Sequence, residues 1–236
     1  MCRQFDSAPS HSNRDRGNWA QRGVFVACSL QMTTRRVFLL SPARCDGRRA
    51  QVLLSTSADF PLARRLRSDS GAPLGEIFSF LSGLYFRGKL AYANAFAAAL
   101  ADAPETLIIT TDRGLVAPHQ HVTHHDLRAF ARVDLDGRDA RYRTPLRRDV
   151  DALEEALGES TGLILLGSIA TGKYVDPLLE QFGDRLVFPA EFVGRGDMSR
   201  GGLLLRCVRE ARELQYVPVA GGIRRGKRPP RLELLR

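Results

Sequence analysis

A glycine-rich string, Gly167-Ser-Ile-Ala-Thr-Gly-Lys173, follows a run typical of a buried strand and precedes a helical run. This is the order of a phosphate-binding P-loop, in which backbone N–H groups surround phosphate oxygens and the lysine adds positive charge. Tyr174 stands where a P-loop has the Ser or Thr that holds Mg²⁺. We therefore expect an anion-binding turn that does not depend on Mg²⁺, made by Gly167, Ser168, Thr171, Gly172 and Lys173. A plain turn with a solvated lysine and a true P-loop NTPase are the alternatives.

A second glycine-rich stretch, residues 188–202, lies between a predicted strand and a predicted helix. Dense glycines let the backbone approach a ligand closely, and Arg195 and Arg200 could each hold a phosphate or carboxylate with two N–H groups. Ser199 adds a hydroxyl to this anion site, and Glu191 adds a carboxylate. The alternative is a mobile loop whose polar residues only cap the next helix.

A third polar group, Asp112-Arg113-Gly114, ends the strand predicted for residues 106–111. Ligands of open α/β sheets bind beyond the carboxyl ends of the strands, so this group and both glycine-rich segments should share one edge if their strands are parallel. One Asp, one Lys and two or three Arg at that edge suit a phosphorylated or polyanionic ligand, with Arg113 among the cations. Asp112 and Glu191 are the candidates for general acid and base catalysis.

Lysine is rare in this chain, which has three lysines against 32 arginines. Lys89 and Lys173 each follow a glycine, where a compact ammonium differs from a guanidinium in reach and in its capacity for a lowered pKa. We therefore add Lys89 to the candidate anion site. Chance is the alternative explanation for so small a number.

Histidine and cysteine give weaker signals for a metal. His119, His121, His124 and His125 crowd a short segment, but they straddle the helix start predicted by the capping box Thr123-His-His-Asp126. An exposed capping turn is the favoured interpretation and a transition-metal site the alternative. The four cysteines contain no C-x-x-C pair, which favours a reducing cytoplasm and argues against a disulfide framework. We predict no metal and no cofactor.

Apolar runs that alternate with helical segments position these residues. This alternation is typical of the α/β class, and we predict a single three-layer domain with a mostly parallel sheet of about six strands. The predicted strands are residues 37–40, 51–55, 106–111, 162–166, 185–188 and 216–219. The predicted helices are residues 84–100, 123–132, 144–157, 174–182 and 203–214, with a loop at 134–143.

The chain of 236 residues, 44% of them hydrophobic, is long enough to close one large core. Its net charge of +9 is uneven, because residues 221–236 carry +5 and residues 1–31 carry +2. We predict a disordered leader over residues 1–33, a domain over 34–222 and a basic tail over 223–236. A mitochondrial-type targeting peptide is the minor alternative for the leader. No apolar run reaches the roughly 20 residues of a membrane helix, so we predict a cytoplasmic protein without membrane contact.

Four strings together resemble the hallmarks of a bacterial family of uncharacterised α/β proteins. They are residues 83–90 (GLYFRGKL), 112–116 (DRGLV), 167–174 (GSIATGKY) and 192–202 (FVGRGDMSRGG). The resemblance spans about residues 36–219 and implies the α/β fold without an activity. The layout is also distantly similar to uracil-DNA-glycosylase-like and tRNA-base-modifying proteins, which implies nucleobase or nucleic-acid chemistry.

The expected function is therefore binding of a phosphate-bearing ligand, either a phosphorylated small molecule such as a nucleotide or a nucleic acid. Hydrolysis of an N-glycosidic or phosphoester bond is the reaction that the available groups favour. The alternative is a non-catalytic nucleic-acid-binding module that uses the basic tail to contact phosphates.

Overall fold

The computed structural model describes residues 36–97, 104–170, 172–223, 226–227, 229–230 and 232. These residues belong to one compact unit, Met32–Arg236. The predicted leader, Thr171 and much of the predicted basic tail lie outside the described residues.

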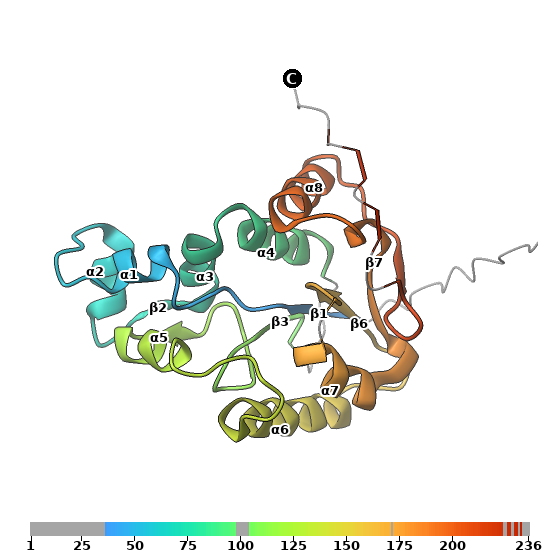
Figure 1. The fold of residues 1–236 in the computed structure, drawn as a ribbon, viewed down its shortest axis with the longest axis horizontal. Coiled ribbons are helices and arrows are strands. Elements are labelled where there is room, and N and C mark those ends of the chain that lie inside the picture. Colours follow the sequence, from blue (N-terminus) through green and yellow to red (C-terminus); the bar gives the residue numbers. More distant parts are fainter. Residues whose placement is uncertain are drawn as a thin grey trace, which may run out of the picture. The chain divides into compact units, whose positions relative to one another are not determined.

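A six-stranded sheet forms the centre of this unit, in the order β4-β3-β1-β6-β7-β8 (Figure 1). The strands are β1 (Arg36–Leu40), β3 (Thr106–Ile109), β4 (Leu115–Val116), β6 (Gly162–Leu166), β7 (Leu186–Pro189) and β8 (Tyr216–Pro218). The four inner strands are parallel, whereas β4 and β8 pair with them antiparallel at the two edges. The predicted α/β class with a mostly parallel sheet is therefore confirmed.

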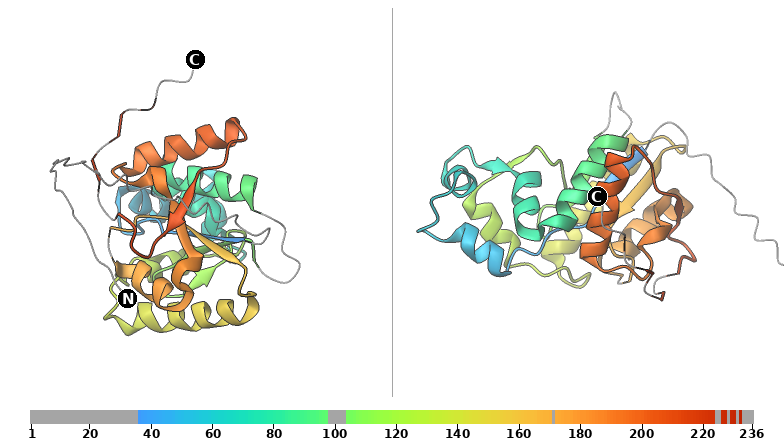
Figure 2. Two further views of the ribbon diagram at one scale, coloured as in Figure 1. Left: turned by 90° about the vertical axis from the view of Figure 1, so that its right-hand side faces the viewer. Right: turned by 90° about the horizontal axis from the view of Figure 1, so that it is seen from above.

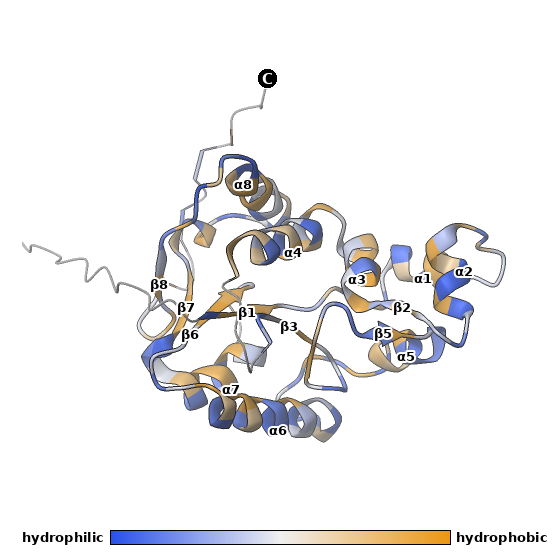
Figure 3. Cartoon of the chain, turned by 180° about the vertical axis from the view of Figure 1, so that it is seen from behind, coloured by the Kyte–Doolittle hydropathy of each residue, from blue (hydrophilic) through white to orange (hydrophobic). Residues whose placement is uncertain are grey.

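The inner strands are buried on both sides because their sequences are continuous apolar runs. β1 and β6 pair over their whole length, from Arg36 opposite Gly162 to Leu40 opposite Leu166. Val37 to Leu40 and Leu163 to Leu166 are fully buried. In Figure 3 the inner strands are largely orange, whereas the outer side of the molecule at α6 is largely blue.

Helices cover both faces of the sheet and make the three layers. α4 (Leu84–Phe96) and α8 (Asp197–Arg209) lie on one face, and α6 (Ala140–Ala156) and α7 (Gly172–Phe182) lie on the other (Figures 1 and 2). α3 (Leu74–Ser82) packs beside α4. The remaining elements are α1 (Arg48–Leu54), α2 (Pro61–Arg67), α5 (His124–Phe130), the paired strands β2 (Ala72–Pro73) and β5 (His121–Val122), and the 3₁₀ turns η1 (Gly183–Arg185) and η2 (Ala190–Phe192).

Four predicted elements differ from the structure by more than two residues. One is the helix predicted for 84–100, which ends at Phe96. The strand predicted for 51–55 is wrong, because these residues belong to α1, which buries Ala50 and Leu53 and exposes Val52. α8 begins at Asp197, six residues before the predicted start, and so includes two glycines that read as loop. α6 begins at Ala140, inside the predicted loop. The capping box at Thr123 is confirmed, with both the Thr123 and the Asp126 hydrogen bonds formed.

Candidate functional site at the carboxyl edge of the sheet

The strand order creates a topological switch point between β1 and β6. From β1 the chain moves outward to β3, and it then returns to the other side of β1 to form β6 and β7. In open α/β sheets this is where the chain leaves a crevice for ligands, beyond the carboxyl ends of the two strands. Ser41 follows β1, and Gly167 and Ser168 follow β6, so these residues mark the candidate site.

Lys89 of α4 is the most unusual residue at this edge, because a lysine that is only 1% exposed is rare in a folded protein. Its Nζ donates to the backbone oxygen of Ser41 at 2.5 Å and to Ser41 Oγ at 2.9 Å. It also lies 4.6 Å from the ring centroid of Tyr85 and 4.7 Å from that of Phe86. Burial lowers the pKa of Lys89 to about 7. Within the described part of the chain, no carboxylate forms an ion pair with it.

Lys89 reaches this position because α4 and α8 approach each other closely. A Cβ atom on Gly88 would lie 2.7 Å from the backbone oxygen of Gly201, so only glycine at this position allows the contact. Because α4 and α8 cross at Gly88 and Gly201, the neighbouring residues Lys89 and Arg200 lie in the same region. Asp197 of α8 raises the pKa of Lys89, whereas Arg200 of α8 lowers it.

Arg200 is held against the backbone rather than by a carboxylate. Its Nε and Nη2 donate to the oxygen of Phe192 at 3.2 and 3.1 Å, and its guanidinium lies over the Phe192 ring. Nη1 lies 3.6 Å from Oδ1 of Asp197, whose side chain is 71% exposed. Such a contact is weak because water screens it. The Arg200 side chain is itself only 12% exposed, so its charge is poorly neutralised by the protein.

Arg195, just before α8, and Ser199, in the first turn of α8, form a neighbouring pair. Arg195 donates from Nε to the backbone oxygen of Glu191 at 3.0 Å and from Nη1 to Oγ of Ser199 at 3.2 Å. Oε2 of Glu191 is buried and has no hydrogen-bond partner among the described residues. The predicted anion-binding residues of this loop therefore contact one another beside the first turn of α8.

Tyr85 of α4 adds a polar atom with no partner. Its side chain is 6% exposed, and within the described residues its hydroxyl makes no hydrogen bond. Burial raises the pKa of this phenol, while the charge of Arg200 lowers it and that of Asp197 raises it. Leaving a buried hydroxyl unpaired costs about 1–3 kcal/mol. A ligand that bonds to Tyr85 in this cluster would recover that free energy.

Polar groups of the predicted phosphate-binding turn are hydrogen-bonded to Tyr174 and to one another. The hydroxyl of Tyr174 donates to the Ser168 oxygen at 2.8 Å and accepts from the Ser168 N–H at 3.0 Å, while the Ala170 N–H donates to Ser168 Oγ at 3.3 Å. Two N–H groups of this turn are thus already paired within the protein. Gly167 is in contact with β1: a Cβ there would lie 2.9 Å from Cβ of Ser41. Thr171 lies outside the described residues.

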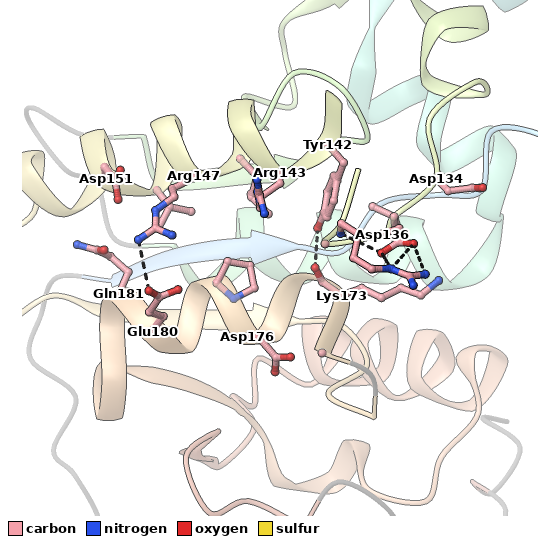
Figure 4. Close-up of a pocket in the computed structure, with 17 residues that line it drawn as sticks. Asp134, Asp136, Tyr142, Arg143, Arg147, Asp151, Lys173, Asp176, Glu180 and Gln181 are labelled. Atoms are coloured by element: carbon pink, nitrogen blue, oxygen red, sulfur yellow. Dashed lines mark hydrogen bonds and ion pairs between the residues drawn. The ribbon is translucent and has the colours of Figure 1, made fainter. Parts of the chain in front are cut away.

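Lys173 lines a pocket of about 790 Å³ between α6 and α7 (Figure 4). The apolar part of its lining includes Tyr142, Leu146 and Val150. Its charged residues are mixed in sign: Arg138, Arg143, Arg147 and Lys173 against Asp134, Asp136, Asp151, Asp176 and Glu180. Arg147 bonds to Glu180 across the pocket at 3.3 Å. With more acidic than basic groups, the pocket is a poor match for a phosphate.

Asp112 lies at the end of β3 in a different pocket, of about 460 Å³, together with Arg141 and Arg148. Its Oδ1 is buried without a hydrogen-bond partner among the described residues, and burial raises its pKa while Arg113 opposes that shift. Arg113 bonds to Asp126, the capping residue of α5, and its Nε lies 3.9 Å from Asp112. The two candidates therefore do not line the pocket that contains Lys173.

Two of the four clustered histidines, His121 and His124, contact backbone oxygens. His121 Nδ1 lies 2.8 Å from the oxygen of Ser70, and His124 Nε2 lies 3.2 Å from the oxygen of Leu54. No cluster of three potential metal-binding His, Cys, Asp or Glu residues occurs in the described ranges. None of the helices in those ranges is both long and apolar enough to cross a membrane.

The structure thus brings part of the predicted site together and separates the rest. Lys89, Gly167, Ser168 and Arg200 gather at the switch point, with Arg195, Ser199 and Glu191 beside them. Lys173 and Asp112 lie in two other pockets. The sequence analysis missed Ser41, Tyr85 and a bonding role for Tyr174. Ser41 could have been found, because it directly follows the strand predicted for residues 37–40.

Comparisons of the chain with protein-family models, with curated proteins and with solved structures give no match. The function is therefore argued from the geometry of the switch-point cluster, defined here as Ser41, Tyr85, Lys89, Ser168, Tyr174 and Arg200.

Proposed function

We propose that the chain binds a phosphate-bearing ligand, a nucleotide or a nucleic acid, with the phosphate at the switch-point cluster. One observation carries the proposal: Lys89 is fully buried and bonds only to uncharged groups of Ser41 among the described residues. Burying an ammonium without a counterion is costly, and the lowered pKa of Lys89 expresses that cost. An anion bound beside Ser41 would compensate it.

Three further features support a phosphate rather than a neutral ligand. Arg200 adds a second poorly neutralised cation to the cluster. α8 begins here, and the first turn of a helix carries free N–H groups and a partial positive charge that favour an anion. The unpaired hydroxyl of Tyr85 supplies a buried hydrogen-bond donor.

Calorimetric titration with inorganic phosphate, AMP, ATP and a single-stranded oligonucleotide tests this proposal. Lys89→Met should weaken binding by about 10- to 100-fold, the usual range for one charge-assisted hydrogen bond. Lys173→Met makes the same chemical change at an exposed position and should leave the affinity within about twofold. Adding EDTA should change little, because no Mg²⁺ is needed.

A proton-uptake measurement makes the test sharper. An anion beside Lys89 raises its pKa, so binding at pH 7.5 should take up protons, seen as a dependence of the heat on the ionisation enthalpy of the buffer. Lys89→Met should abolish this uptake. Loss of binding in Lys173→Met but not in Lys89→Met would place the ligand at the 167–173 turn instead. Absence of binding by all four ligands would overturn the proposal.

A further inference from the structure

Ser41 and Lys89 have the arrangement of a nucleophile and its base. Ser41 Oγ lies 2.9 Å from Lys89 Nζ, at the carboxyl end of the central strand β1. Ser41 is 7% exposed and Lys89 is 1% exposed, so both members of the pair are buried. Serine hydroxyls become nucleophilic when a neighbouring base accepts their proton, and serine–lysine pairs serve this purpose on several unrelated folds.

We propose that Ser41 Oγ attacks the phosphorus of a phosphoester substrate while the amine of Lys89 accepts the serine proton. The inference rests on the proposed function, because that function places the phosphate next to Ser41. It deepens that function by naming the substrate class, a phosphoester, and the group that attacks it. Arg200 is placed to neutralise the charge of the transferring phosphoryl group.

The hydrogen bonds of Lys89 suit a neutral amine. A neutral amine has two N–H groups and one lone pair. When Lys89 loses a proton it can still donate to the Ser41 backbone oxygen at 2.5 Å, while the 2.9 Å contact in which it donates to Oγ reverses and its lone pair accepts from the hydroxyl. The pKa of about 7 leaves a large fraction of Lys89 neutral in the protein without ligand. A bound phosphoester raises this pKa, so the amine acts as the base above the raised pKa. The charged groups that act on Lys89 are Asp197 and Arg200. The phenols of Tyr85 and Tyr174 have a pKa raised by burial and stay neutral there.

The steps balance without an added reagent other than water. In the first step the Oγ–P bond forms, the P–O bond to the leaving alcohol breaks, and the Ser41 proton passes to Lys89 and from there to the leaving oxygen. In the second step water attacks phosphorus, gives one proton to Lys89, and the Oγ–P bond breaks as Ser41 takes that proton back. The net reaction is phosphoester plus water to alcohol plus phosphate.

The other described nucleophiles fit this role less well. Burial raises the pKa of Cys45 to about 12, and burial also raises the pKa of Cys207, so both remain thiols near neutral pH. Both are buried, and neither has a basic amine as a hydrogen-bond partner among the described residues. Among the described serines, Ser41 is the one bonded to a buried lysine.

A fluorophosphonate probe, which modifies activated serines with loss of fluoride, tests the pair on the full chain. Wild type should be labelled at Ser41, as mapped by peptide mass spectrometry. Ser41→Ala should abolish labelling, and Lys89→Met should slow it by about 100-fold, within the usual range for a general base. The rate in wild type should rise as the pH passes through about 7, and this rise should vanish in Lys89→Met. Ser79→Ala, in α3, is the control and should react like wild type.

Turnover of p-nitrophenyl phosphate completes the test. Acid quenching during turnover should trap a phosphoryl group on Ser41 in wild type and none in Ser41→Ala. Phosphate binding without labelling or turnover would overturn this inference and leave the proposed function standing. Labelling of Ser41 without phosphate binding would overturn the proposed function and the substrate class together. Labelling at another serine would overturn the assignment of Ser41.

Discussion

Gly88 of α4 and Gly201 of α8 lie back to back, so that a Cβ on Gly88 would lie 2.7 Å from the backbone oxygen of Gly201. Gly88→Ala should push the two helices apart and lower the free energy of unfolding by about 1–3 kcal/mol, as overpacking does in cores. Urea denaturation measures the change. Gly158→Ala is the control, because nothing lies within 4 Å of its Cβ position. Equal stability of the two variants would contradict the close contact.

Lys89 should give the stability of the protein a distinct dependence on pH. Its pKa is about 7 when folded and about 10.5 when unfolded, so between these values the unfolded chain binds more protons and stability rises with pH. Below pH 7 the folded state carries the full cost of the buried ammonium. The stability of wild type relative to Lys89→Met should therefore increase from pH 7 to pH 9, by at most about 1.4 kcal/mol per pH unit. Urea titrations of both proteins at pH 6, 7, 8 and 9 measure this difference. A difference that stays constant would mean that Lys89 is not buried as an amine.

Asp112 should show the opposite dependence. Burial raises its pKa above that of the unfolded chain, so the folded state binds the proton more tightly and stability falls as the pH rises through that window. Asp112→Asn removes the buried charge and should raise the Tm at pH 7 but have a smaller effect at pH 3.5, where the carboxyl is mostly protonated in both states. Thermal scans at the two pH values test this. Asp184→Asn, at an exposed position of η1, should leave the Tm unchanged at both.

Tyr174 should stabilise the turn after β6 through its hydroxyl. Tyr174→Phe removes two hydrogen bonds to the backbone of Ser168 and should cost about 1–3 kcal/mol. Tyr142→Phe is a matched change on the same face of the sheet and removes only the bond to the Lys173 oxygen, so it should cost less. Chemical denaturation compares the two. A larger loss in Tyr142→Phe would contradict the bridging role of Tyr174.

The sequence was sufficient to predict the inner strands because these are continuous apolar runs bounded by turn residues. Residues 162–166 match β6 at both ends. The run at 51–55 was misassigned because a short apolar stretch does not distinguish a strand from a helix. The start of α8 was hidden by Gly201 and Gly202, which are poor helix formers in isolation. Gly201 is required here, because a Cβ on it would lie 2.7 Å from the Leu84 oxygen of α4.

The candidate site was predictable only in part, for a related reason. The expected edge could be placed by the rule for parallel sheets, and Lys89 and Arg200 do meet near it. Their meeting depends on two glycines more than 100 residues apart in the chain, and no local pattern reveals such a contact. The direction of Lys173 was likewise unpredictable, because Tyr174 turns inward to bond Ser168 and leaves its neighbour on the outer side of α7.

The two outermost strands of the sheet determine how molecules of this protein can associate. β4 has two residues and β8 has three, ending in Pro218, which has no N–H to donate. Short edge strands and edge prolines offer little unpaired backbone to a strand from another molecule. Among the described residues, the two edges of the sheet are therefore poor sites for pairing with a strand of another copy.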